Sequence, residues 1–204
     1  MKKKALLVVD VQNDFCPGGA LAVPDGDAVI PIINKISKRF DRVVATQDWH
    51  PKNHMSFAVQ HKKKEYEIIR WKDMDQVLWP VHCVPGTRGA EFHKNLDARP
   101  FHLIIRKGTD PEIDSYSTFL ENDKKTYTGL HYYLNGLGIK QIYLTGLATD
   151  YCVYFSAMDA KNLGFDVTVI IDATRGIDVP QGSIEKAVLD MTKRGVRIVT
   201  HDVL

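Results

Sequence analysis

Short apolar runs alternate with longer amphipathic segments along this chain, and that alternation constrains the fold more than any other feature. The apolar runs are rich in Val, Ile and Leu, without the strict polar alternation of a half-exposed strand. Such runs are typical of strands buried on both faces of a parallel sheet. The predicted strands are Ala5–Val9, Arg42–Thr46, Leu103–Ile105, Gln141–Thr145, Val167–Ile171 and Val196–Val199.

The segments between these runs carry helical spacing. We expect helices over Asp27–Phe40, Thr128–Leu137, Asp150–Leu163 and Ser183–Lys193. Asp27 and Ser183 suit N-caps, and Gly138, Gly164 and Gly195 fit positions just past helix ends. Strand–helix alternation of this kind predicts an α/β fold, with helices on both faces of a parallel sheet and right-handed crossovers.

Bulk properties exclude several function classes. A length of 204 residues suits one domain, 1–204, and the formal net charge of +2 is too small to favour nucleic acid or an anionic membrane as a partner. No apolar stretch is long enough to span a bilayer. Three cysteines without CxxC spacing make a disulfide framework unexpected and favour the reducing cytoplasm.

Residues 49–100 interrupt the alternation. The segment is too long for a simple connection, and long excursions in compact domains are often functional. We interpret the polar run at 61–65, HKKKE, as a solvated loop. For residues 58–78, a lid over a site and an interface both remain open, and a homo-oligomer is compatible with the sequence.

Polar residues cluster just after the predicted strands. Asp10, Gln12, Asp14 and Phe15 follow the first strand, and Asp48, Trp49 and His50 follow the second. Lys107 follows the third, Gly146 through Cys152 follow the fourth, and Asp172 follows the fifth. Ligands in open α/β sheets bind beyond the carboxyl ends of the strands, so these residues predict a site.

Three of them suit nucleophilic catalysis. Cys152 lies at a predicted helix start, where the helix dipole and free N–H groups favour a thiolate and could hold an oxyanion. Asp10 abuts Val8 and Val9, so partial desolvation would raise its pKa and suit a general base. If Lys107 points into the site, its positive charge would stabilise both the Cys152 thiolate and the Asp10 carboxylate. The alternatives are a packed cysteine, an aspartate that caps a helix or forms a turn, and a snorkelling surface lysine.

A second group has the residue types of a metal site. Asp48, His50 and His54 lie within seven residues, and His82 arrives later in WPVHC. A carboxylate with imidazoles suits zinc, iron or manganese. The spacing does not decide between His54 and His82 as the direct ligand. Near these loops, Phe15, Trp79 and Tyr116 could clamp a planar ring or could serve core packing.

Taken together, five stretches resemble the isochorismatase-like cysteine hydrolases and, within them, the nicotinamidases, also called pyrazinamidases. They are VVDVQNDFCPGG at 8–19, TQDWHPKNHMSF at 46–57, WPVHCVPGTRGAEF at 79–92, KGTDPEIDSYSTF at 107–119 and LTGLATDYCV at 144–153. The resemblance implies a three-layer αβα sandwich around a six-stranded parallel sheet, in agreement with the strand count.

The resemblance also implies roles for individual residues. Asp10, Lys107 and Cys152 match the catalytic acid/base, lysine and nucleophile. Asp48, His50 and His82 match the metal ligands, while His54 matches a position that is a ligand only in some members. A cis peptide bond between Leu147 and Ala148 would aim the Ala148 N–H, with that of Cys152, at an oxyanion. Phe15, Trp79, Tyr116 and Leu147 match substrate-binding positions.

The function so implied is hydrolysis of nicotinamide to nicotinate and ammonia through a Cys152 thioester, with pyrazinamide as a further substrate. The implied cofactor is one divalent metal ion, with zinc expected and iron or manganese as alternatives, which would orient the substrate ring. Three alternatives remain: an amidase for carbamoyl or ureido substrates, a metal-hydroxide hydrolase with a structural Cys152, and a non-catalytic binding protein.

Overall fold

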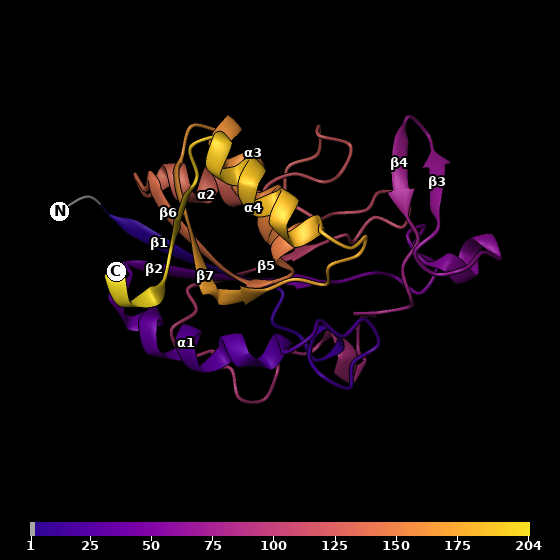
Figure 1. Ribbon diagram of the computed structural model, residues 1–204, viewed down its shortest axis with the longest axis horizontal. Coiled ribbons are helices and arrows are strands. Elements are labelled where there is room, and N and C mark those ends of the chain that lie inside the picture. Colours follow the sequence, from indigo (N-terminus) through magenta and orange to yellow (C-terminus); the bar gives the residue numbers. More distant parts are fainter. Residues whose placement is uncertain (1–2) are drawn as a thin grey trace.

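A computed structural model describes residues 3–204 of the chain and confirms the parallel sheet (Figure 1). Within these residues, six parallel strands form the sheet in the order β5-β2-β1-β6-β7-β8. The strands are β1 (Lys4–Val9), β2 (Arg42–Asp48), β5 (Leu103–Lys107), β6 (Gln141–Leu147), β7 (Asp166–Arg175) and β8 (Arg197–Val199). Each matches a predicted strand, and four of them continue further at their carboxyl ends than predicted.

Helices cover both faces of the sheet, which confirms the three-layer αβα sandwich (Figure 1). The helices are α1 (Val29–Ile36), α2 (Leu130–Gly136), α3 (Tyr154–Asn162) and α4 (Ser183–Lys193). One face packs against α1, through buried side chains such as Val29 and Ile33. The opposite face packs against the other helices, through residues such as Leu130, Ala157 and Met191.

Two predicted helix caps differ from the structure. Asp27 lies inside a 3₁₀ turn, Gly26–Ala28, and α1 begins after it. At α4, the carboxylate of Asp178 accepts the Gly182 and Ile184 N–H groups at 2.9 and 3.3 Å, so it caps this end of the helix. Ser183 is instead the first helical residue.

The long excursion contains a two-stranded antiparallel hairpin that the sequence pattern did not predict. Its strands are β3 (Ile68–Trp71) and β4 (Met74–Val77), and they project from the body of the molecule (Figure 1). Most of the preceding 61–65 run is exposed, as a solvated loop would be. The hairpin is not isolated from the interior, because Gln76 Nε2 donates to Asp114 Oδ2 at 2.7 Å.

Strand order reverses between β1 and β6 near the middle of the sheet. From β1 the chain builds outward to β2 and β5, and then crosses to β6, β7 and β8 on the other side. At such a switch point the loops after neighbouring strands run to opposite faces, which leaves room for a ligand at the carboxyl ends. No helix in residues 3–204 is long and apolar enough to cross a membrane.

Candidate active site

The carboxyl ends of four neighbouring strands bring the predicted catalytic side chains together. Asp10 follows β1, Asp48 ends β2 and Lys107 ends β5, while Cys152 lies in the turn after β6. Asp48 and Lys107 are register partners across β2 and β5. Because parallel strands end at the same edge, residues far apart in the sequence become neighbours here.

Lys107 lies at the centre of this group and is fully buried. Its Nζ is 2.8 Å from Asp10 Oδ2, pairs with Asp48 Oδ1, and lies 3.4 Å from Cys152 Sγ. It also donates to the Ser115 carbonyl at 2.9 Å. Burial alone would lower the pKa of Lys107, but the charges of Asp10 and Asp48 raise it well above its ordinary value. The ammonium is therefore a fixed positive charge, not a surface lysine.

The Cys152 thiol is protonated at rest. Burial raises its pKa well above the ordinary value, and Lys107, which lowers it, is opposed by Asp10 and Asp48. This outcome contradicts the expectation that the helix start would favour a thiolate. Burial also raises the pKa of Asp10, against the lowering effect of Lys107. Cys152 Sγ lies within 4.8 Å of carboxylate oxygens of Asp10 and Asp48, so the group holds a protonated thiol beside a potential base.

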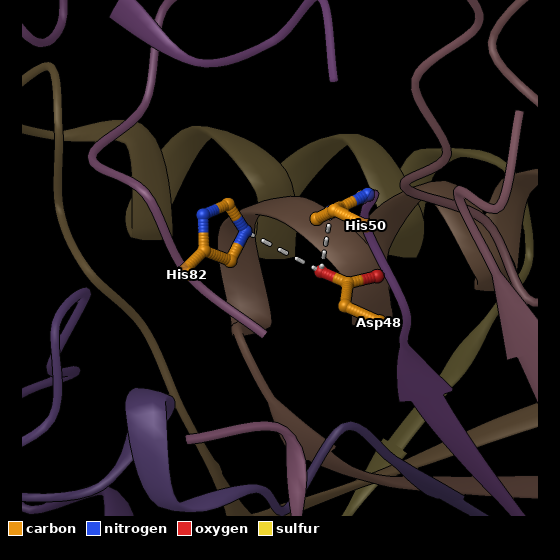
Figure 2. Close-up of side chains that lie close together, drawn as sticks. All are labelled: Asp48, His50 and His82. Atoms are coloured by element: carbon orange, nitrogen blue, oxygen red, sulfur yellow. Dashed lines mark ion pairs between the residues drawn. The ribbon is translucent and has the colours of Figure 1, made fainter. Parts of the chain in front are cut away.

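Asp48, His50 and His82 form a second group that could hold a cation (Figure 2). The Nε2 atoms of His50 and His82 lie 3.5 and 3.7 Å from Asp48 Oδ2. Each imidazole has its Nδ1 against a backbone carbonyl, Gly108 O at 2.9 Å and Pro80 O at 2.8 Å respectively. A carbonyl only accepts, so each Nδ1 carries a proton. In the neutral ring each Nε2 then keeps a lone pair, as in histidines that bind metal.

The electrostatics of this group also favour a positive charge. Burial would lower the pKa of His50, but Asp48 raises it above its ordinary value. The pKa of Asp48 is held well below its ordinary value, because Lys107 and His50 overcome the effect of burial. An ionised carboxylate beside two imidazole lone pairs has the donor chemistry of a zinc, iron or manganese site.

His54 is placed differently from His82. Its Nδ1 lies 2.7 Å from Ser56 Oγ, and its Nε2 lies 3.2 Å from the Ile113 carbonyl. Both ring nitrogens are therefore engaged with protein groups. Burial and the neighbouring His50 lower the pKa of His54 to about 4, so the ring is neutral. In this arrangement His82, not His54, completes the group around Asp48.

A cavity opens in front of these residues and has largely apolar walls. Asp48, His50, His82, Ala148 and Cys152 are among the residues that line it. The walls include Phe15, Leu21, Val23, Trp79, Tyr116, Tyr151 and Ile177. Trp79 meets Tyr151 edge-on at 4.9 Å and donates from Nε1 to the Tyr116 hydroxyl at 3.1 Å. These contacts fix the aromatic walls, which suit a flat ring carrying a polar group.

Residues 4–203 match the model of the isochorismatase domain. The chain belongs to the isochorismatase family. It is 50% identical over 202 residues to the nicotinamidase of Acinetobacter baylyi, and the match covers 98% of this chain and 94% of the relative.

Two solved structures extend the comparison of this isochorismatase-family chain. PnC1 from L. infantum in complex with nicotinate has a TM-score of 0.87 and 36% identity, covering 100% of this chain and 95% of that one. The pyrazinamidase of Pyrococcus horikoshii in complex with zinc has a TM-score of 0.80 and 40% identity, covering 97% of this chain and 99% of that one.

Of the four residues predicted to bind substrate, three line the cavity and one does not. Phe15, Trp79 and Tyr116 lie in the cavity wall of this isochorismatase-family site, and the Leu147–Ala148 peptide bond is cis. Leu147 differs from the prediction, because its side chain is fully buried in the cluster that packs against α1 and is not in the cavity wall. Its position at the end of a strand could not show which way its side chain points.

Other residues of the isochorismatase-family site were missed. Asp114 and Ile177 line the cavity, although the sequence pattern gave them no role, and Tyr151 was expected near the site only as part of the 146–152 stretch. Asp114 lies inside the quoted 107–119 stretch, so the resemblance held a signal for it. Gln12 holds Asp48 by donating from Nε2 to its carbonyl and accepting its N–H, both at 2.8 Å. The position of Gln12 after the first strand was a signal in the sequence, but only the structure shows that its partner is Asp48.

Proposed function

We propose that this chain hydrolyses nicotinamide to nicotinate and ammonia. The observation that carries the proposal is the buried Asp10–Lys107–Cys152 group facing a cavity with aromatic walls. The nicotinamidase relative at 50% identity and the nicotinate complex support the same substrate. The pyrazinamidase likeness supports pyrazinamide, a similar flat amide, as a second substrate.

In the proposed reaction, Asp10 accepts the proton of the Cys152 thiol while the sulfur attacks the carboxamide carbon. The C–N bond then breaks, and Asp10 passes the proton to the departing amine, which leaves as ammonia. A thioester to Cys152 remains. Asp10 next takes a proton from water, whose oxygen attacks the thioester carbon, and returns that proton to the thiolate as nicotinic acid leaves; the acid then loses its proton to solvent as nicotinate.

In this proposal, backbone N–H groups and Lys107 stabilise the negative charges that develop during the reaction. The backbone N–H groups of Ala148 and Cys152 would donate to the oxyanion, and losing one such donor typically costs about 3–4 kcal/mol. Lys107 would hold Asp10 and the developing thiolate at the same time, since its Nζ contacts both residues. The positive charge thus stays beside the negative charge as it moves from carboxylate to sulfur.

Asp48, His50 and His82 would hold one divalent metal ion, and the donor set and their free Nε2 atoms fit it. When bound, this ion would orient the pyridine ring through its nitrogen. Zinc is the proposed ion, supported by the zinc complex of the pyrazinamidase, with iron and manganese as the alternatives. The aromatic walls would hold the flat ring and exclude water.

We further propose that residues 1–204 form one domain, and that the protein works in the cytoplasm, since the three cysteines of the described chain are free and buried. The small-molecule substrate requires no nucleic acid or membrane partner. A homo-oligomer stays a prediction.

The deciding experiment measures ammonia from purified protein given nicotinamide, with Cys152→Ala as the matched variant. We expect release by the wild type only. Release from a ureido compound but not from nicotinamide would overturn the substrate. Near-full activity of Cys152→Ala would instead favour a metal-hydroxide hydrolase with a structural cysteine.

A further inference from the structure

Residues 176–182, between β7 and α4 (Figure 1), form a strap. Ile177 of this strap lines the cavity. The strap has no regular secondary structure until α4 begins at Ser183. A wall built from such a segment needs something to hold it in place, because loops without regular hydrogen bonds are otherwise mobile.

The carboxylate of Asp150 supplies that hold. Its Oδ1 accepts the Ile177 N–H at 3.0 Å, and its Oδ2 accepts the Asp178 N–H at 2.9 Å and the Ser183 hydroxyl at 2.5 Å. Asp150 is only 6% exposed, so water competes little for these bonds. Hydrogen bonds to an ionised acceptor are about twice as strong as neutral ones.

The next residue adds a second tie. The Tyr151 hydroxyl donates to the Val179 carbonyl at 2.6 Å, while its ring lines the cavity. Asp150 and Tyr151 immediately precede Cys152, in the π-helical turn Thr149–Val153. The strap is therefore fastened to the same turn that carries the thiol.

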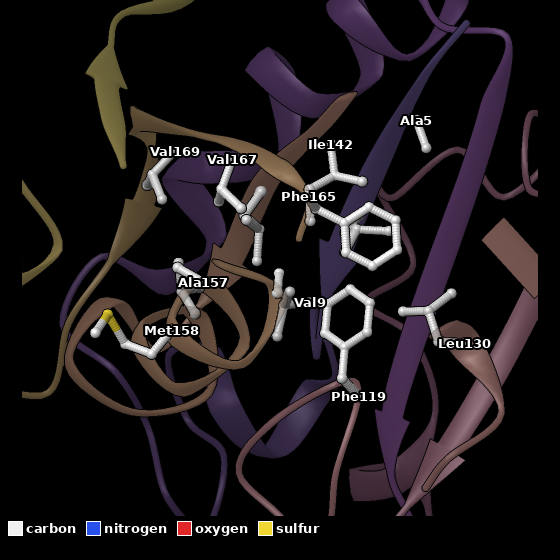
Figure 3. Packing of buried hydrophobic residues seen from close by; sticks show 14 of the residues in the cluster. Ala5, Val9, Phe119, Leu130, Ile142, Ala157, Met158, Phe165, Val167 and Val169 are labelled. Carbon is white, nitrogen blue, oxygen red and sulfur yellow. The ribbon is translucent and has the colours of Figure 1, made fainter. Parts of the chain in front are cut away.

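The turn itself is anchored from its other end. It runs directly into α3, and Figure 3 shows Ala157 and Met158 of that helix packed near Val167 and Val169 of β7. The thiol's position thus depends on the core, whereas the strap's position depends on the side chains of Asp150 and Tyr151.

We propose that Asp150 is a positioning residue that fixes the strap, and through it Ile177, as a wall of the substrate cavity. Asp150 does not line that cavity but lines a second groove beside α4, which shares only Tyr151 with the cavity. It therefore acts on substrate binding and not on the chemistry at Cys152. The proposal deepens the proposed function and rests on it for its substrate.

Asp150→Asn tests this with little change of shape. The carboxamide keeps one acceptor oxygen, so either the Ile177 or the Asp178 N–H faces an NH₂ group and loses its partner. We expect KM for nicotinamide to rise roughly tenfold or more, the factor for an unsatisfied buried donor, while kcat stays within about threefold. Alkylation of Cys152 by iodoacetamide should keep its wild-type rate.

Ser183→Ala is the matched control, since it removes one of the three bonds and leaves both N–H partners in place. We expect a smaller KM rise of about two- to fivefold, the lower part of the range for one net hydrogen bond. Tyr151→Phe removes only the tie to Val179 and should also raise KM. If Asp150→Asn does not fold, these two variants decide, and an unchanged KM in both overturns the proposal.

Amide hydrogen exchange provides a readout that needs no substrate. In Asp150→Asn the Ile177 and Asp178 amides should lose protection while the amides of β6 and β7 keep theirs. Protection retained at both positions, or a fall in kcat with unchanged KM, overturns the positioning role. Wild-type protein that releases no ammonia from nicotinamide refutes the proposed function alone, because the exchange result still reports on the strap.

Discussion

Replacing Lys107 by Met should strongly destabilise the protein and abolish most of its activity. In the wild type, Nζ contacts two carboxylates, Asp10 and Asp48, and all three side chains are between 0 and 5% exposed. Two negative charges and one positive charge give the group a net charge of −1, and Lys107→Met leaves −2 in the same volume. Removing one partner of a buried ion pair costs about 3–5 kcal/mol.

That loss is large beside a typical total stability of about 5–15 kcal/mol. Activity should fall by at least about 100-fold, the lower end of a general-base contribution, because Asp10 loses the cation that lowers its pKa. The double variant Lys107→Met/Asp10→Asn restores the net charge of −1. It should therefore recover most of the lost stability while staying inactive, which separates the electrostatic effect on folding from catalysis.

Urea unfolding followed by tryptophan fluorescence measures the stability, and ammonia release measures the activity, with and without prior chelation. Lys63→Met is the control, since it breaks an exposed ion pair with Glu67 and should change neither quantity appreciably. A Lys107→Met protein as stable as the wild type would refute the reasoning. So would a double variant no more stable than the single one.

Three other perturbations follow from the same geometry. Cys152→Ser should bind nicotinamide but release no ammonia above background, and rapid turnover would rule out the thioester route. The kcat/KM profile should fall as pH drops through an Asp10 pKa above 3.8, since burial raises it; in Lys107→Met any residual acid limb should move to higher pH, because Lys107 lowers that pKa. His82→Ala should lower bound zinc and activity together, whereas His54→Ala should retain about one zinc per chain; elemental analysis after dialysis distinguishes them, and equal losses would assign His54 as a ligand.

The sheet could be predicted because its strands are buried on both faces. Apolar runs such as Ala5–Val9 are typical of strands buried on both faces, and their alternation with helices along the chain implies the parallel arrangement. The hairpin of β3 and β4 was not predicted, for the opposite reason. Its strands are short and half exposed, with Ile68 itself 66% exposed, so they carry no burial pattern.

The site could be predicted in part, because strand ends converge whatever the side chains do. That rule brought Asp10, Asp48 and Lys107 together from positions far apart in the sequence. It could not give the direction of a side chain, which sent Leu147 into the core. Nor could it show that Ser183 donates to Asp150, since that contact joins the first residue of α4 to the turn after β6.

The protonation state of Cys152 shows where a local rule loses to a tertiary one. A helix N-terminus stabilises a negative charge by about 0.3–1 kcal/mol, and up to about 2 kcal/mol in partly buried sites. Full burial shifts a pKa by up to about 3–5 units, or about 4–7 kcal/mol, in the opposite direction. Burial therefore wins, and the resting sulfur is a thiol even with Lys107 at 3.4 Å.

A buried thiol can still become a nucleophile if its proton moves to a neighbour and not to water. Transfer from Cys152 to Asp10 leaves the net charge of the buried group unchanged, since a carboxylate becomes neutral as a thiolate forms. Lys107 contacts both residues, so the ammonium remains paired throughout. Burial destabilises the Asp10 carboxylate as well as the Cys152 thiolate. The free-energy cost of the proton transfer therefore depends on the difference between these two burial penalties. This is the physical reason to expect a carboxylate at position 10 to be required, and Asp10→Asn to be as inactive as Cys152→Ala.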